Sequence, residues 1–167
     1  MNYFELFEIP IQLQIEQKFL PHKYFELSKK FHPDYFINQS SEIQESILEK
    51  SAALNKGFNI FKNPLETIKY LLQLKGLLVE EEKYELPPIF LLQVMDINEQ
   101  IEIAANEDNN WQIALHNLEN EIYNPVKEII ENYKDGISTE KELLQVKDYY
   151  FKKKYLQRIQ QQLNRLL

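Results

Sequence analysis

The sequence predicts an all-helical protein, and three observations support this. Glycine occurs only three times in 167 residues, at Gly57, Gly76 and Gly136, so the turn residues expected between many short strands are scarce. Apolar residues recur at spacings of three and four along most of the chain, which is the period of one helix face. Stretches with the strict alternation of a half-buried strand are hard to find. We therefore expect helices that pack through apolar stripes.

The composition limits the class of protein. An apolar content of 44%, with 13% aromatic residues, suffices for packed cores in one or two small domains. The formal charge of −7 argues against general nucleic-acid binding, because contacts to phosphates require surplus cations. The chain contains no cysteine, so it cannot ligate a metal or cluster through thiolates, and a reducing compartment is favoured. We expect a soluble cytoplasmic protein with no membrane contact, because no apolar run approaches the roughly 18 residues of a membrane span.

The first long helix is predicted over residues 20–31. Leu20, Tyr24, Leu27 and Phe31 step by four, three and four and form one apolar stripe, which should face the core. The polar residues of this helix lie away from the stripe and should face solvent or a partner: His22, Glu26 and Lys29 opposite it, and Lys23 and Lys30 on its flank.

His32-Pro33-Asp34 follows this helix directly. Proline lacks a backbone donor, holds φ near −65° and biases the preceding residue out of the α region, so the tripeptide should end the helix and fix two polar side chains. The next helix is predicted to begin at Ser41, where Ser41 and Gln44 fit a capping box, and to run to Phe61. The two helices then form an antiparallel hairpin with the tripeptide at its tip.

The chain is predicted to divide after Gly76. Asn63 and Pro64 supply the N-cap and the first residue of a short helix that stops at Gly76. The acidic segment that follows, ending at Pro87-Pro88, is typical of an interdomain linker. We therefore expect one domain over residues 1–76, a linker over residues 77–88 and a second domain over residues 89–167.

The second domain is predicted to be a three-helix bundle. Its first helix runs from Ile89 to Ala105, and Asp108-Asn109-Asn110 forms the loop before the second. The second helix is interrupted at Asn124-Pro125, where a proline predicts a kink or a short break near Tyr123. Thr139 and Glu142 cap the third helix, which runs through Leu166.

Four segments carry a more specific pattern. They are Asn2-Tyr3-Phe4 with Leu6-Phe7 and Ile9-Pro10; Tyr24, Leu27, Lys29 and Phe31 leading into His32-Pro33-Asp34; Ser51-Ala52, Leu54-Asn55 and Phe58; and Asn63-Pro64-Leu65 with Tyr70-Leu71-Leu72, Leu74 and Gly76. A His-Pro-Asp tripeptide at the tip of a helical hairpin is typical of a J-domain. On all four segments the chain resembles the HscB family, the J-domain co-chaperones of iron–sulfur cluster assembly, over nearly its whole length.

The resemblance implies two binding sites and no cofactor, metal site or catalytic residue. The J-domain is expected to stimulate the ATPase domain of a DnaK-type chaperone, normally HscA, and the bundle to hold an IscU-type iron–sulfur scaffold protein and deliver it to that chaperone during cluster assembly and transfer. The chaperone-binding residues implied are His32, Pro33, Asp34, Lys23, Lys29 and Lys30. The scaffold-binding residues implied are Leu91, Leu92, Met95, Asp96, Glu99 and Tyr155, of which Leu92, Met95, Asp96 and Glu99 share one helix side, while Val94, Ile97, Ile101 and Ala104 mark another.

Simpler interpretations exist for each feature. The tripeptide alone can be an ordinary helix stop, the lysines a solvated face, and Leu91, Leu92 and Met95 part of the bundle core. A general J-domain protein that delivers other clients to DnaK would carry the same tip. A metal site built from histidines is disfavoured because His22 and His32 lie roughly 15 Å apart along a helix. An enzyme that uses His32 and Asp34 is disfavoured because no nucleophile has a matching signature and no glycine-rich phosphate loop is present. Nucleic-acid binding is disfavoured because no surface interleaves aromatic and basic residues.

Overall fold

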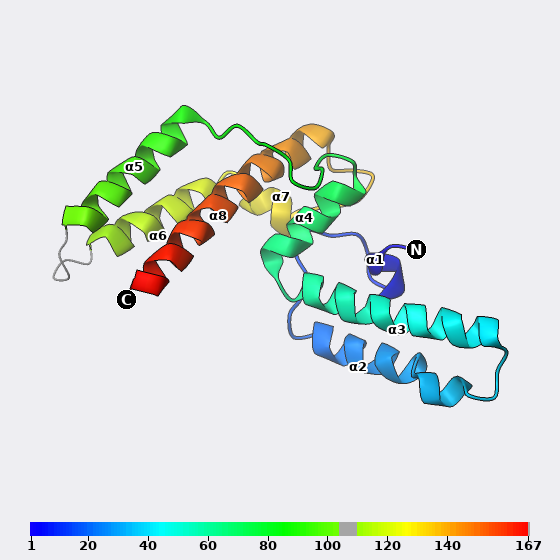
Figure 1. Cartoon of the computed structure of the whole chain (residues 1–167). Coiled ribbons are helices and arrows are strands. Elements are labelled where there is room, and N and C mark those ends of the chain that lie inside the picture. Colours follow the sequence, from blue (N-terminus) through cyan, green and yellow to red (C-terminus); the bar gives the residue numbers. More distant parts are fainter. Residues whose placement is uncertain (104–109, 167) are drawn as a thin grey trace. The chain divides into compact units, whose positions relative to one another are not determined.

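The computed structural model describes residues 1–103 and 110–166, and within these ranges it is helical and contains no strand (Figure 1). The predicted helix end at Ala104 and Ala105, and Asp108 and Asn109 of the predicted loop, lie outside the described residues. None of the helices described is long and apolar enough to cross a membrane. The elements are α1 (Tyr3–Leu6), α2 (Leu20–Lys30), the 3-10 helix η1 (Pro33–Phe36), α3 (Ser41–Phe61), α4 (Pro64–Leu74), α5 (Pro88–Ile103), α6 (Asn110–Tyr123), α7 (Lys127–Asn132) and α8 (Glu140–Leu166).

The chain forms two compact units. The first comprises Met1–Leu71 and Tyr133–Ile137, and the second comprises Leu72–Asn132 and Ser138–Leu167. The first sequence boundary between the two units therefore lies within α4, after Leu71. The assignment of residues 1–76, 77–88 and 89–167 to a J-domain, a linker and a scaffold-binding domain stays a prediction.

In the first unit, α2 and α3 form the predicted antiparallel hairpin (Figure 1). Leu27 of α2 and Leu54 of α3 are buried in the unit, and the rings of Tyr24 and Phe58 stack with centroids 4.3 Å apart. Most polar residues of α2 are exposed, as the spacing of its apolar residues predicts: His22, Glu26, Lys29 and Lys30.

An aromatic cluster joins α1 to the C-terminal end of α3. Phe4 and Phe7 are fully buried against Phe61, with ring centroids 4.9 Å and 5.3 Å from it. This approach requires Gly57, because a Cβ at that position would lie 2.8 Å from Cε2 of Phe7. Glycine within α3 is therefore explained by the packing of α1 against it.

The caps agree with the sequence prediction at α4 and α8 and differ from it at α3. Asn63 Oδ1 accepts from the amide of Leu65 at 3.0 Å, and Thr139 Oγ1 accepts from that of Glu142 at 3.2 Å. The predicted capping box of Ser41 and Gln44 is wrong. Ser40 is the N-cap of α3, and the Gln44 side chain instead donates to the carbonyl oxygens of Ile37 and Gln39, each at 2.9 Å.

Gly76 ends α4 as predicted. Its φ of 71° is left-handed, which glycine adopts without steric cost. The amide of Leu77 donates to the carbonyl of Leu72 at 2.9 Å, and the amide of Gly76 donates to that of Gln73 at 3.0 Å. These two bonds form a Schellman motif and satisfy carbonyls at the helix end.

In the second unit, α5, α6 and α8 pack around one apolar core, as the predicted bundle requires (Figure 1). Asn124-Pro125 breaks the second predicted helix into α6 and α7, and Val126 between them is buried. The core consists of Phe90, Val94 and Ile97 of α5, Leu115, Leu118 and Ile122 of α6, and Leu156 of α8.

Candidate protein-docking sites

The His-Pro-Asp tripeptide forms a defined bend at the tip of the hairpin. His32 is extended, with φ −73° and ψ 126°, as the following proline predicts, and its carbonyl accepts from the amide of Tyr35 at 3.1 Å to close the turn of η1. The Nδ1 atom of His32 accepts from the amide of Asp34 at 3.3 Å. The backbone therefore holds the bend and orients the His32 side chain.

Both polar side chains of the bend are accessible. The side chain of His32 is 53% exposed and that of Asp34 is 77% exposed, and Nδ1 of His32 lies 3.7 Å from Oδ2 of Asp34. Tyr35 is 72% exposed beside them, with its ring 5.8 Å from that of His32. An imidazole, a carboxylate and a phenol are thus presented together to an external partner.

The three lysines assigned to α2 differ in their surroundings. Lys29 is exposed and its Nζ lies 4.4 Å from the centre of the Phe25 ring, which is itself 61% exposed. Lys30 is also exposed, but its Nζ lies 3.3 Å from Oε1 of Glu8. The side chain of Lys23 is only 12% exposed, so the expectation that it faces solvent is wrong, and its contact with a partner stays a prediction.

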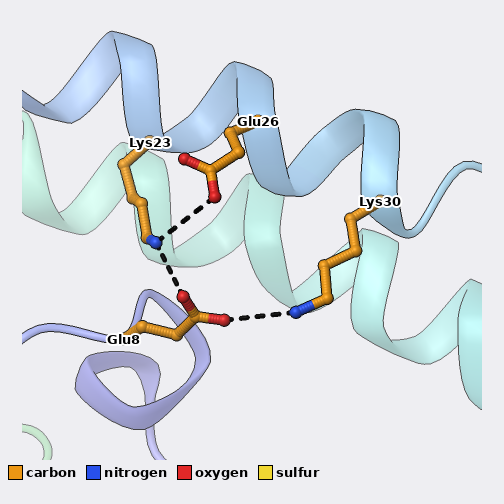
Figure 2. Close-up of polar contacts among 4 residues, drawn as sticks. All are labelled: Glu8, Lys23, Glu26 and Lys30. Atoms are coloured by element: carbon orange, nitrogen blue, oxygen red, sulfur yellow. Dashed lines mark hydrogen bonds and ion pairs between the residues drawn. The ribbon is translucent and has the colours of Figure 1, made fainter.

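Glu8 accounts for this difference. Figure 2 shows its carboxylate between the two lysines, with Oε2 at 2.7 Å from Nζ of Lys23 and Oε1 toward Lys30, while Glu26 approaches Lys23 at 3.6 Å. The hydrogen bonds from Lys23 and then Lys30 lower the pKa of Glu8, and the hydrogen bond to Glu8 raises the pKa of Lys23. Glu8 and Lys23 are therefore both charged at neutral pH.

Sequence reasoning missed Glu8 because it lies 15 residues before Lys23, in the turn that follows α1. Its φ is 56°, a left-handed conformation that is uncommon for glutamate and that no sequence signal indicated. Sequence reasoning also assigned no role to Phe25 and Tyr35, whose large exposed rings lie beside Lys29 and His32. Their position in the sequence next to the assigned residues was the available signal.

A second exposed surface lies on α5. Leu92 is 60% exposed and Met95 is 56% exposed, and Asp96 and Glu99 are exposed beside them. The side chains that enter the bundle core, such as Val94, come from the opposite side of the helix. The alternative that Leu92 and Met95 belong to the core is therefore wrong, whereas Leu91, at 36%, lies at the margin of the exposed side.

Tyr155 has a different environment from the other five residues assigned to this surface. It is partly buried on α8, packs against the bundle core and meets the ring of Phe90 edge-on, with centroids 6.1 Å apart. Tyr155 therefore contributes to the packing of the bundle, and its role in binding a partner stays a prediction.

The comparisons with known proteins agree with this arrangement. Residues 86–164 match the family described as HSCB C-terminal oligomerisation domain. The HscB co-chaperone homologue of Shewanella woodyi is 30% identical over 169 residues, which cover 99% of this chain and 97% of the relative. The HscB co-chaperone of Buchnera aphidicola is 40% identical over 120 residues, which cover 71% of this chain and 68% of the relative.

Solved structures show the same fold. HscB from Vibrio cholerae aligns with a TM-score of 0.65 and 26% identity, over 99% of this chain and 97% of that one. Human co-chaperone HscB aligns with a TM-score of 0.69 and 25% identity, over 98% of this chain and 81% of that one. On its sequence, its fold and its J-domain hairpin, the chain belongs to the HscB family of co-chaperones.

Proposed function

We propose that this co-chaperone acts as an adaptor in iron–sulfur cluster assembly. Its J-domain stimulates ATP hydrolysis by a DnaK-type chaperone, normally HscA, and its bundle delivers an IscU-type scaffold protein to that chaperone. The observation that carries the proposal is the exposed imidazole of His32 beside the exposed carboxylate of Asp34, on a bend that the backbone holds at the hairpin tip.

The bend suits a protein that stimulates a chaperone ATPase without catalysing a reaction itself. Proline and the turn of η1 fix the backbone before any partner binds, so little conformational entropy is lost when His32 and Asp34 dock. The hairpin behind them is anchored by buried residues such as Leu27 and Leu54. Contact with the ATPase domain can then change the conformation of that domain rather than the conformation of the J-domain.

The cations of α2 direct the encounter. On a chain with a formal charge of −7, a local basic face favours one orientation of approach to an acidic surface, while overall repulsion disfavours the others. Lys29 is the most freely presented of the three assigned lysines, because Lys23 and Lys30 are paired with Glu8. We assign the direct contact to Lys29, with Lys30 adjoining it.

The α5 surface is the proposed scaffold-binding face. Leu92 and Met95 present apolar side chains to solvent on the side of α5 opposite the core, where they do not contribute to the bundle's own packing. Asp96 and Glu99 beside them fit a partner that offers apolar contacts next to cations. Because the chain has no cysteine to ligate a cluster, we place the cluster itself on the scaffold, in the reducing cytoplasm.

Single-turnover ATP hydrolysis tests the proposal. HscA and DnaK would each be assayed with and without the scaffold, in the presence of the intact chain or the His32→Gln variant. We expect the intact chain to accelerate hydrolysis and the variant to lose that effect while remaining folded. Stimulation of HscA with the scaffold beyond that of DnaK supports the dedicated role, and equal stimulation of both supports a general J-domain protein. Undiminished stimulation by His32→Gln would contradict the proposed role of the tip.

A further inference from the structure

One carboxylate pairs with two of the lysines on the proposed chaperone-facing side of α2. The two oxygens of Glu8 point to different lysines, Oε2 to Lys23 at 2.7 Å and Oε1 to Lys30 at 3.3 Å (Figure 2). Glu26 adds a second carboxylate 3.6 Å from Lys23. The two lysines and the two glutamates therefore form a cluster with no net charge.

The backbone holds Glu8 in place. The amide of Glu8 donates to the carbonyl of Glu5 and that of Ile9 to the carbonyl of Phe4, both at 3.0 Å, so the turn after α1 is hydrogen-bonded on both sides of Glu8. Phe7, the residue before it, is fully buried. The carboxylate cannot leave the lysines by a movement of this turn unless Phe7 also leaves the core.

We propose that Glu8 is an internal competitor for the α2 lysines, which it withholds from an acidic protein surface so that it limits the affinity of J-domain docking. This inference rests on the proposed function, in which that surface belongs to the chaperone's ATPase domain. A carboxylate of the partner that approaches Lys30 must displace Glu8 or share the lysine with it, and it is repelled by Glu8 while it does so. Lys23 is largely covered already.

The left-handed backbone of Glu8 supports this assignment. A φ of 56° costs free energy for a residue with a Cβ, and glycine would adopt it freely. A side chain held in such a conformation, beside two of the assigned lysines, points to a role for its functional group. The functional group here is the carboxylate that bridges two lysines.

Lysine labelling tests the competition without a partner. Acetic anhydride at limiting concentration would be applied to the intact chain, to Glu8→Gln and to the control Glu45→Gln, which removes the same charge from an exposed position on α3. In Glu8→Gln we expect Lys23 and Lys30 to react about twofold faster or more, and Lys29 to react as before. Unchanged reactivity of both lysines would overturn the inference, whatever the partner proves to be.

Titration of the ATPase tests the consequence. At low salt, the concentration of Glu8→Gln that gives half-maximal stimulation of HscA should be about threefold lower than that of the intact chain, with the same maximal rate. Glu45→Gln should match the intact chain, and the gain should disappear when Lys30→Ala is added. No gain, or an equal gain with Lys30→Ala present, would overturn the inference. If the intact chain fails to stimulate, the proposed function fails instead, and the labelling still decides the role of Glu8.

Discussion

The ring of Tyr84 lies flat against that of Phe151, with centroids 4.4 Å apart and planes 3° apart, and the Tyr84 hydroxyl donates to Oδ1 of Asp148 at 2.8 Å. Two residues earlier, Glu82 pairs with Lys147 at 2.8 Å, and both side chains are largely covered. The end of the acidic segment is thereby attached along one side of α8. The acidic residues and Pro87-Pro88 indicated a linker, so this attachment is information that only the structure supplies.

Tyr84→Phe should lower the free energy of unfolding by about 1 kcal/mol, because it keeps the ring stack and removes a hydrogen bond to a charged acceptor. The loss stays modest because Asp148 retains its ion pair with Lys152 at 2.7 Å. Urea unfolding would measure it, with Tyr35→Phe as control, since Tyr35 is 72% exposed. Equal effects of the two substitutions would contradict the assigned contact.

Stability should fall at alkaline pH through a group of shielded tyrosines. Burial first, and then the hydrogen bond to Asp148, raises the pKa of Tyr84 to about 12, and burial raises that of Tyr149 to about 12. Because the folded pKa exceeds the unfolded value near 10, the folded state holds more protons between these values, and stability is lost as pH rises from about 10 to about 12.

This pH dependence can be assigned to one residue by substitution. Thermal or urea unfolding of the intact chain and of Tyr84→Phe would be followed from pH 9 upward, below and within the titration range. The difference in stability between the two proteins should shrink as pH rises, because the intact chain alone loses the contribution of the Tyr84 hydroxyl. A difference that stays constant up to about pH 12 would contradict the shifted pKa.

Alanine substitutions of Lys23 and Lys29 should have different effects: the first should lower stability and the second should weaken docking to the chaperone. Lys23→Ala removes a largely covered side chain and its ion pair with Glu8, so it should lower the free energy of unfolding by about 1 kcal/mol with little change in half-maximal stimulation of the chaperone. Lys29→Ala should change stability by less than about 0.5 kcal/mol and weaken docking about threefold at low salt. The reverse pattern would show that Lys23 makes the partner contact.

Substitutions on the two sides of α5 should also differ in their effects. Combined Leu92→Ala and Met95→Ala should weaken scaffold binding by more than about 1 kcal/mol while leaving the stability of the bundle nearly unchanged. Val94→Ala, at a position 2% exposed, should instead lower stability by about 2 kcal/mol with scaffold affinity retained in the folded fraction. Calorimetric titration of both variants would measure scaffold affinity, and urea unfolding would measure stability. If the double variant Leu92→Ala/Met95→Ala unfolded the bundle, those two residues would belong to the core.

Local sequence signals predicted much of the fold. Asn63, Gly76 and Thr139 act at helix ends as their residue types predict, because capping depends on neighbours within about four residues. The split of α5 into core and exposed sides follows from helical periodicity in the same way. The start of α3 at Ser41 was predicted correctly, but its N-cap was misplaced by one residue because Ser40 and Ser41 offer the same capping group.

The charge distribution of the candidate site could not be predicted in this way. Whether Lys23 is available to a partner depends on Glu8, which approaches it through a left-handed turn and the packing of α1 against α3. No helical period relates the two residues. Periodicity placed Lys23 on the flank of the apolar stripe, and only the tertiary structure shows that a carboxylate covers that flank.

Complementation in trans tests most directly whether one chain links the chaperone to the scaffold. With limiting scaffold, the intact chain would be compared with an equimolar mixture of His32→Gln and the Leu92→Ala/Met95→Ala variant in single-turnover ATP hydrolysis by HscA. Because linkage raises the effective concentration of the scaffold at the chaperone, the mixture should fall well below the intact chain. Equal rates of ATP hydrolysis with the mixture and with the intact chain would contradict the adaptor role.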